Sequence, residues 1–289
     1  MKLNQNPFIV ILGIIQDGGL PQCGCKRLCC KKAWKKPSLR KWVASLAIID
    51  PKTKQRWLID ATPDFKHQLA FLDQVFSVKK KSPGLAGIFL THGHAGHYTG
   101  LLCFEKSTLN SKNVLVWTMP KMEKLLKNNI PWKGLVKGKN IAIKKLCKNK
   151  EVALNNNLSV LPFLVSHRDE FTETIGFFIK GPNKTCLFVP DIDNWQNIEE
   201  KILKSDIAFL DGTFFEPKEI PNRDISKIPH PLIKESIKRF ADLPLKEKQK
   251  IHFIHFNHTN PVLVKNSRAQ KLIKKNHFRI AKQGQEFSL

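Results

Sequence analysis

The 289-residue sequence contains no long hydrophobic run. The apolar stretch near its N-terminus, Phe8 to Leu12, covers only five residues before Gly13. A helix that crosses a bilayer needs about 20 apolar residues, and a secretory signal needs a longer apolar segment with small residues at a cleavage site. The stretch is typical of a first strand instead. We therefore expect a cytoplasmic protein with no membrane partner.

Acidic residues and arginine are both scarce. The chain has 24 Asp and Glu against 49 Lys and Arg, a formal net charge of +25, and only 8 of these cations are arginine. Arginine is the better bidentate phosphate ligand, and a dedicated nucleic-acid surface clusters its charge, whereas the lysines here are scattered from Lys2 to Lys282. We interpret the charge as a solvated, lysine-rich surface. It favours a small, anionic substrate over nucleic acid as the partner.

Cysteine occurs in an odd number, seven, which argues against a disulfide framework. Four of the seven, Cys23, Cys25, Cys29 and Cys30, fall within eight residues. This cluster has two interpretations: ordinary reduced thiols, or thiolates that hold a separate structural zinc ion. Simultaneous ligation by the adjacent Cys29 and Cys30 is expected to be strained. A zinc site would then use three thiolates and a fourth ligand from elsewhere in the chain.

The chain also lacks internal repeats, low-complexity tracts and any Pro-, Gly- or Ser-rich linker, which predicts a single domain over residues 1–289. Short apolar runs with the length and β-branched content of strands recur along it, with helical patterns between them. This mixture predicts a layered α/β fold. Strands are expected at 8–15, 43–49, 56–60, 85–90, 114–118, 158–165, 175–180, 185–190, 206–211 and 251–256, and helices at 65–75, 121–127, 194–203, 231–243 and 261–275.

Three histidines lie within six positions directly after the expected strand 85–90. They are His92, His94 and His97. Imidazoles at this spacing in a glycine-containing loop can turn several ring nitrogens toward one or two metal ions, and neutral imidazole suits both zinc and iron. The alternative is a polar loop that is histidine-rich by chance. Because three of only ten histidines fall here, we favour a metal site.

Polar residues follow three further expected strands. Taken singly, such residues are typical of turns and caps. Together they repeat the order His cluster, His, Asp, His along the chain, and a layered domain would present them at one sheet edge. The residues are His167 and Asp169 after the run 160–165, Asp191 and Asp193 after 185–190, and His258 after 251–256.

This order resembles that of the metallo-β-lactamase-fold superfamily, whose metal ligands lie on loops between the strands of a four-layer αββα sandwich. The resemblance runs over nearly the whole chain and includes Asp60, which ends the expected strand 56–60. Within the superfamily, the sequence looks most like the branch of pyrroloquinoline quinone biosynthesis protein B. The segments that carry this likeness are 13–30 (GIIQDGGLPQCGCKRLCC), 98–102 (YTGLL) and 255–261 (HFNHTNP).

The resemblance implies a metal-dependent active site. By the family's motif, His92, His94 and His167 would form a first metal site, Asp191 would bridge, and His97 and His258 would hold a second ion. Two divalent ions in one cavity can polarise a substrate oxygen and lower the pKa of a bridging water. We expect one or two ions of zinc, with iron or manganese as alternatives.

Gly96 departs from the family's pattern, which has Asp between the second and third histidines of the loop. In the family that Asp ligates the second metal and orients the attacking water. Its absence predicts a second site that binds more weakly than the first or takes a different metal, and Gly96→Asp is expected to raise the occupancy of that site. Asp17, Asp193 and Asp169 are candidate replacements as the water-orienting base, although each could instead orient another ligand or cap a turn.

Three functions follow as hypotheses. The leading one is a hydrolase that uses metal-activated water on an ester, lactone, amide or phosphodiester. The second is an Fe(II)-dependent oxygenase or another role in quinone-cofactor biosynthesis, as the branch resemblance implies; two histidines and one carboxylate at the second site suit non-haem iron. The third is a non-catalytic metal-binding protein that has lost the aspartate at position 96.

Overall fold

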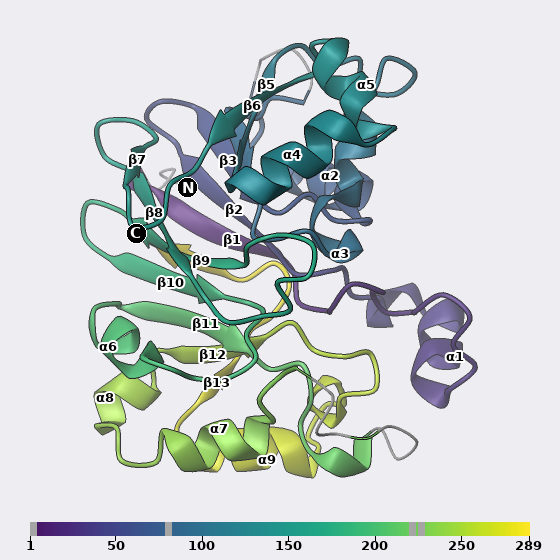
Figure 1. The fold of residues 1–289 in the computed structure, drawn as a ribbon. Coiled ribbons are helices and arrows are strands. Elements are labelled where there is room, and N and C mark those ends of the chain that lie inside the picture. The colour runs from purple at the N-terminus through teal and green to yellow at the C-terminus, as the bar shows by residue number, and fades with distance from the viewer. Residues whose placement is uncertain (1–4, 79–82, 220–223, 225–228) are drawn as a thin grey trace.

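The computed structural model describes residues 5–78, 83–219, 224 and 229–289. Two seven-stranded mixed sheets form the centre of the molecule (Figure 1). In spatial order, the first sheet contains β14 (Glu286–Ser288), β1 (Phe8–Gly13), β2 (Ser45–Asp50), β3 (Gln55–Ile59), β4 (Gly87–Phe89), β5 (Val114–Thr118) and β6 (Ile141–Lys145). The second contains β13 (Arg279–Ile280), β12 (Ile251–Ile254), β11 (Ile207–Asp211), β10 (Thr185–Val189), β9 (Ile175–Lys180), β8 (Ser159–Leu164) and β7 (Val152–Ala153).

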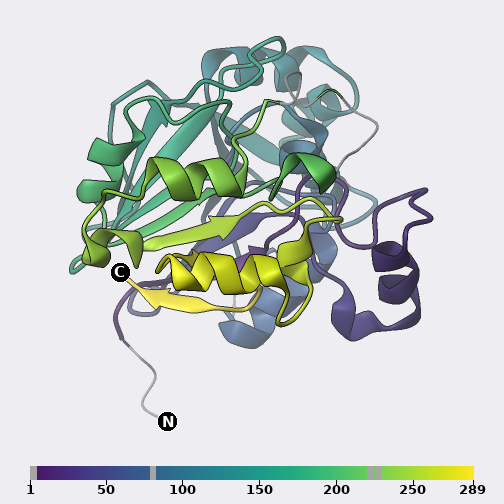
Figure 2. The same ribbon diagram turned by 90° about the horizontal axis from the view of Figure 1, so that it is seen from below.

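Helices cover the outer face of each sheet, which completes the predicted αββα sandwich. The first sheet is covered by α2 (Phe65–Val75), α4 (Pro120–Asn128) and α5 (Trp132–Lys137). The second is covered by α6 (Ile198–Leu203), α7 (Ile233–Arg239) and α9 (Arg268–Lys275), with α8 (Leu245–Lys248) between the last two in the chain. Figure 2 shows α7 and α9 side by side, and α1 (Leu28–Lys35) projecting away from the sandwich. The short α3 (Ala95–Tyr98) follows β4.

Strand β1 is buried on both faces, which explains its continuous apolar sequence. Ile9 and Ile11 belong to the hydrophobic cluster shared with the second sheet. Val10 and Leu12 belong to the cluster under the helices of the first sheet. Because successive side chains of a strand point to opposite faces, a strand covered on both sides has no position for a polar residue.

All ten predicted strands form, and the predicted helix 65–75 has the bounds of α2. The prediction missed β7, β13 and β14, which have two or three residues each and are too short to show a period. It also missed β6, whose last two residues are exposed lysines. The helix expected at 261–275 begins only at Arg268, because Asn266 takes a left-handed conformation. The hydroxyl of Ser267 then caps the helix by accepting a hydrogen bond from the backbone N–H of Gln270.

The strand directions bring the predicted ligands to one edge of the sandwich. In the first sheet β3 and β4 are parallel, and β1 runs in the same direction because β2, which lies between β1 and β3, is antiparallel to both. In the second sheet β10, β11 and β12 are parallel, and β8 runs in the same direction because β9, which lies between β8 and β10, is antiparallel to both. A parallel bridge between Ile15, after β1, and Phe256, after β12, brings the ends of these strands in the two sheets to the same side, where ligands bind in layered α/β folds. Among the described residues, no helix is both long and apolar enough to span a membrane.

His252, in β12, is expected to make the fold acid-sensitive. Its ring is buried against Phe209 and Phe287, and burial lowers its pKa to about 4. A histidine held neutral in the folded state stabilises the protein fully above its unfolded pKa of about 6.5, and this contribution is lost as the pH falls toward 4. Between about pH 7.5 and about pH 5, wild type should lose about 2 kcal/mol more of its free energy of unfolding than His252→Asn.

Urea denaturation of both proteins at the two pH values measures this difference. The asparagine amide can replace the Nδ1 hydrogen bond to the Lys250 carbonyl, and the ring packing that the variant loses does not depend on pH. Equal losses in the two proteins would show that His252 protonates freely in the folded state.

Candidate metal centre

The three histidines of the loop after β4 lie together at the ligand-bearing edge. His92 and His97 are buried and His94 is half-buried. The His92 ring centroid lies 4.5 Å from that of His94 and 4.1 Å from that of His97. His94 is the N-cap of α3 and His97 lies within it, so the single helical turn presents all three rings to the same space. The metal-binding interpretation of this loop therefore has the geometry it requires.

Asp60 orients this loop from beneath. It is fully buried directly after β3 and accepts hydrogen bonds from the Thr91 backbone N–H (2.8 Å) and from His97 Nδ1 (2.7 Å). The Thr91 hydroxyl lies between the Asp60 carboxylate and His92 Nδ1, 3.0 Å from the latter. Because Nδ1 of His97 is held by the Asp60 carboxylate, its Nε2 is the ring nitrogen that faces the site. A carboxylate behind a histidine in this way is typical of metal centres.

His167 is oriented in the same manner by Asp193. Its Nδ1 lies 2.9 Å from Asp193 Oδ1, and its ring lies 5.4 Å from that of His92 and 5.2 Å from that of His94. One ring nitrogen from each of these three histidines lies within 4.8 Å of the others. The structure thus brings the expected first-site residues together. It places Asp193, a candidate base, behind a histidine instead of in the reacting space, and Asp169 is exposed.

The second group of ligands corrects the sequence interpretation. His255, not His258, reaches this site: its ring stacks 5.5 Å from that of His97, and its Nδ1 is held by the Thr213 hydroxyl at 2.9 Å. His255 follows β12 in a left-handed conformation (φ 65°), which turns its side chain toward the strand ends. His258, three residues later, lies with Cys25, Cys29 and Cys30.

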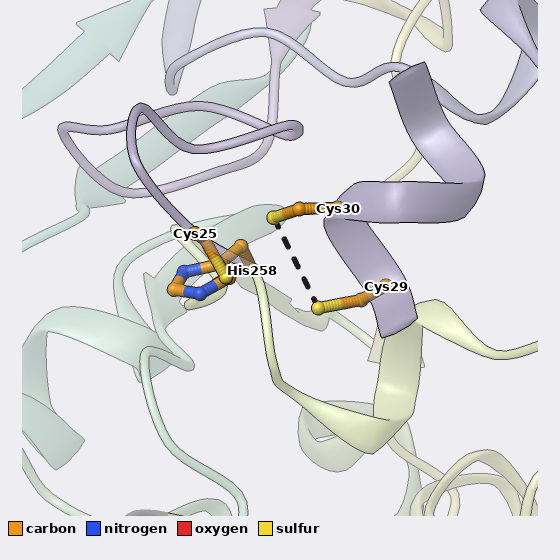
Figure 3. A group of neighbouring side chains, drawn as sticks. All are labelled: Cys25, Cys29, Cys30 and His258. Carbon is orange, nitrogen blue, oxygen red and sulfur yellow. Dashed lines mark hydrogen bonds between the residues drawn. The ribbon is translucent and has the colours of Figure 1, made fainter. Parts of the chain in front are cut away.

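The cysteine group at the base of α1 is a second set of potential ligands. Ligand atoms of Cys25, Cys29, Cys30 and His258 all lie within 4.8 Å of one another, and Figure 3 shows the three sulfurs and the imidazole gathered around one space. Cys23, the fourth cysteine of the predicted cluster, is exposed and outside the group. Three thiols and one imidazole are a ligand set that the structural-zinc interpretation requires.

Asp191 lies between the two groups. It is 3% exposed, and its Oδ2 is 3.1 Å from His97 Nε2 and 3.2 Å from His255 Nε2. Its Oδ2 is also 3.9 Å from His92 Nε2, and its Oδ1 is 3.6 Å from His167 Nε2. The carboxylate therefore faces ring nitrogens of both groups, which is the position expected of a bridging ligand.

Asp17 occupies the space that an Asp at position 96 would need. Its Oδ1 lies 3.3 Å from His97 Nε2, and together with His97 and His255 it forms a group of potential ligands. A Cβ atom added to Gly96 would lie 2.5 Å from Asp17 Oδ1 and 2.6 Å from Asp17 Cα. Of the candidate replacements for the missing Asp, the structure thus places Asp17, a residue 79 positions earlier, beside the second group of ligands.

We accordingly reverse the expected effect of Gly96→Asp. Because the new Cβ would overlap the side chain and backbone of Asp17, the substitution should destabilise the fold by about 1–3 kcal/mol and should not strengthen the binding of a second ion. Thermal unfolding and calorimetric metal titration measure the two effects. Gly96→Ala adds the same Cβ without a carboxylate and should show a similar loss of stability. A stable Gly96→Asp variant with tighter second-ion binding would contradict the overlap.

His230 and Asp211 form a part of the site that sequence reasoning did not assign. Asp211 ends the buried strand β11, so it shows the same pattern of a polar residue at the end of an apolar strand as Asp191 does. Its Oδ2 lies 2.7 Å from His230 Nδ1. Burial lowers the pKa of His230, but the carboxylates of Asp211 and Asp191 outweigh this and raise it to about 9. His230 and Arg168 help to line a cavity of about 250 Å³ that opens onto Asp17 and Asp191.

Charge is distributed unevenly among the clustered groups. Burial lowers the pKa of His97, but Asp60, Asp17 and Asp191 raise it well above its usual value. Burial acts to raise the pKa of Asp191, but the neighbouring His255 and His97 outweigh this effect, and the pKa of Asp191 lies well below its usual range. A metal ion at His97 Nε2 therefore competes with a proton, as is usual for histidine ligands.

The donor atoms at the centre fit a metal ion. Four buried polar atoms there make no hydrogen bond among the described residues, although Asp191 Oδ2 lies close to two of the ring nitrogens: Nε2 of His97, His167 and His255, and Oδ2 of Asp191. Buried polar atoms are nearly always hydrogen-bonded, so four exceptions in one place require an explanation. The opposite nitrogen of each histidine is already held by Asp60, Asp193 or Thr213. These side chains are oriented as ligands.

Comparison with known proteins agrees with this geometry. Residues 55–256 match the model of the beta-lactamase superfamily domain. The chain belongs to the beta-lactamase superfamily. Within the superfamily it is 23% identical to coenzyme PQQ synthesis protein B of Methylorubrum extorquens (strain PA1), with 96% of this chain and 98% of that protein aligned. It is 27% identical to the protein of the same name from Xanthomonas euvesicatoria pv. vesicatoria, with 88% and 91% aligned.

Solved structures of the superfamily share the fold. Zn(2+)-bound PqqB from Methylobacterium extorquens aligns with a TM-score of 0.84 at 22% identity, covering 98% of this chain and 100% of that one. A diphosphatase from the PhnP family aligns with a TM-score of 0.70 at 21% identity, covering 98% of each chain. The predicted resemblance to the superfamily and to its PQQ protein B-like branch is confirmed, as is the αββα architecture.

Proposed function

We propose that the protein is a metal-dependent hydrolase with a two-ion centre. One observation carries the proposal: the buried Asp191 carboxylate lies between two groups of potential ligands, and its Oδ2 and the Nε2 atoms of His97, His167 and His255 make no hydrogen bond among the described residues. The first group is His92, His94 and His167, and the second is Asp17, His97 and His255. Because Asp17 provides a carboxylate, the second site has three ligands of its own besides Asp191. Two ions of comparable affinity are therefore proposed, with zinc favoured by the histidine-rich first site.

The remaining side chains of the cavity suit the cleavage of an anionic ester. Two divalent ions, when bound, lower the pKa of water and polarise a substrate oxygen. His230 is held through its Nδ1 by Asp211 at 2.7 Å and can donate a proton to the leaving group. Arg168 lies at the cavity wall and can pair with a negative charge on the substrate. Asp17 is half-exposed beside His97 and can accept a proton from attacking water.

Among ester, lactone, amide and phosphodiester substrates, we favour a small phosphodiester. The cavity volume of about 250 Å³ suits a small molecule, and its two cationic side chains complement a phosphate. One structural neighbour is named a diphosphatase, which supports a phosphate-containing substrate in general.

The test is anaerobic purification, elemental analysis and an assay with a chromogenic phosphodiester, a lactone and a carboxylic ester. Zinc or manganese with phosphodiester turnover is the expected result. His92→Ala and His167→Ala should abolish this turnover in folded protein. A protein that binds metal but hydrolyses none of the three, and whose two variants lose only stability, would instead be a non-catalytic metal-binding protein.

An Fe(II)-dependent oxygenase, as in a role in quinone-cofactor biosynthesis, is the second candidate. Asp17, His97 and His255 form a set of two histidines and one carboxylate, which is typical of non-haem iron sites with open positions. Similarity to coenzyme PQQ synthesis protein B over nearly the whole chain supports it. Oxygen-sensitive iron and oxygen consumption without hydrolysis would favour this function over the first.

A further inference from the structure

Positive charge is concentrated in the segment 26–41, which contains α1 and the short 3-10 helix η1 (Pro37–Leu39) and is called the basic arm below. The arm holds eight of the 49 Lys and Arg residues, and the chain has no acidic residue between Asp17 and Asp50. The arm therefore contributes +8 to the net charge of +25. Seven of the eight cations are exposed, and none forms an ion pair with a described residue.

The basic arm also exposes large apolar side chains. Leu28, Trp34 and Leu39 all reach solvent, with Leu28 65% and Trp34 57% exposed. All six tryptophans of the chain lie among the described residues, and Trp34 is the only one that is neither buried nor half-buried. A single exposed apolar side chain is ordinary, but three within twelve residues, set among unpaired cations, indicate an interaction surface.

The fold holds the basic arm in a defined position away from the sandwich. Cys30 and Ala33, on the inner side of α1, are buried. Arg40 ties the end of the arm back to α1 by donating to the Ala33 and Trp34 carbonyls, both at 3.2 Å. Figure 2 shows α1 projecting from the sandwich, and in Figure 1 it lies beyond the strand ends on the side of α3, which carries His97 of the metal centre. The cations and apolar side chains of the arm thus project from the ligand-bearing edge.

We propose that the basic arm binds the surface of an anionic lipid bilayer. Lysines close to such a surface are attracted by its negative potential, and a basic helix that exposes Trp and Leu can bury them at the boundary between headgroups and acyl chains. The expectation of no membrane partner rested on the absence of a long apolar run, which a peripheral contact does not need. Because the arm begins nine residues after Asp17, this contact would hold the metal centre close to the bilayer.

Two features of the arm favour a bilayer over nucleic acid. Six of its eight cations are lysine, and both arginines already donate to backbone carbonyls, Arg27 to that of Glu219 at 3.3 Å and Arg40 to those in α1. The free guanidinium forks that are typical of phosphate and base recognition are therefore engaged within the chain. A base can stack on Trp34, but the exposed leucines gain little from RNA, whereas a bilayer accepts both residue types.

Vesicle sedimentation with the full-length protein tests the proposal. Wild type should bind vesicles of equal parts phosphatidylglycerol and phosphatidylcholine, should bind phosphatidylcholine alone at least about 100-fold more weakly, and should be released by added salt. The arm variant combines Lys31→Gln, Lys32→Gln, Lys35→Gln and Lys36→Gln, and it should bind the anionic vesicles at least about 100-fold more weakly than wild type.

A second cluster of exposed lysines provides the matched control. The control variant combines Lys144→Gln, Lys145→Gln, Lys148→Gln and Lys150→Gln. It removes the same charge within seven residues, but these lysines lie on β6 and the segment after it, away from any exposed tryptophan. Its affinity for the anionic vesicles should fall by less than about threefold, because charges farther than a Debye length of about 10 Å from the bilayer are screened.

Tryptophan fluorescence reports whether the arm enters the bilayer. Anionic vesicles with brominated acyl chains should quench part of the wild-type fluorescence, and Trp34→Phe should remove this quenching while the protein still sediments with the vesicles. Wild type that does not bind anionic vesicles, or equal losses in the arm and control variants, would overturn the proposal. So would binding of a single-stranded RNA that only the arm variant loses, in a protein that ignores vesicles. None of these measurements needs hydrolysis or a loaded metal centre, so the proposed function is tested separately.

Discussion

Asp191→Ala should bind no more than one divalent ion tightly and should lose more than about 10²-fold in turnover, because Asp191 is the only carboxylate among the described residues that faces both ligand groups. Its Oδ2 lies 3.1 Å from His97 Nε2, and its Oδ1 lies 3.6 Å from His167 Nε2. Without it, two cations would share the cavity with no anion between them. Even changes to groups behind metal ligands cost about 10–100-fold, so loss of the bridge should cost more. Calorimetric titration and steady-state kinetics measure both effects.

Asp206→Asn is the matched control for that substitution. Asp206 is exposed at the far end of the strands and accepts a hydrogen bond from the Thr185 backbone N–H. The variant should keep both ions and full turnover. If Asp191→Ala still bound two ions with wild-type affinity, Asp191 would not be the bridge.

Asp60→Asn should weaken second-ion binding by about 10–100-fold and reduce turnover in proportion, although Asp60 is fully buried behind His97 and does not line the cavity. The asparagine oxygen can still accept from the Thr91 backbone N–H, but its amide would then face His97 Nδ1. An amide N–H donates, so Nδ1 would become an acceptor and the proton would move to Nε2. That nitrogen faces Asp17 and Asp191 and could no longer bind an ion. Asparagine also tolerates the left-handed conformation at position 60 (φ 67°), so the backbone should be unchanged.

Asp50→Asn controls for the loss of a buried carboxylate. Asp50 is fully buried in the neighbouring β2 and accepts from the Lys52 backbone N–H, with no contact to the centre. It should change stability without changing metal affinity. The tautomer of His97 in each protein can be read from the nitrogen shifts of labelled histidine. An Nε2 that remains unprotonated in Asp60→Asn would rule out the tautomer argument.

The local pattern of residues was sufficient to predict the strands and the chemistry at their ends. Apolar runs such as Phe8–Gly13 must be covered on both faces, and this requirement leads to a layered sandwich. Polar residues directly after such runs must lie at the sheet edge. His92, His167 and Asp191 were therefore expected at one sheet edge although 99 positions separate the first from the last, and the family resemblance assigned them to one metal centre.

The tertiary structure alone decided which of two nearby histidines belongs to which site. His255 and His258 are of the same type and three residues apart, so no local pattern distinguishes them. The left-handed backbone at His255 turns one ring toward Asp191, and the following loop carries the other to the cysteines of α1. The tertiary structure also decided where the carboxylate beside His97 comes from. Asp17, after β1, occupies the space that an Asp at position 96, after β4, would need, and the sequence alone does not show that these two positions are adjacent. The sequence shows which residue types are available, but only the packing of the two sheets brings distant strand ends within the few ångströms over which ligands act.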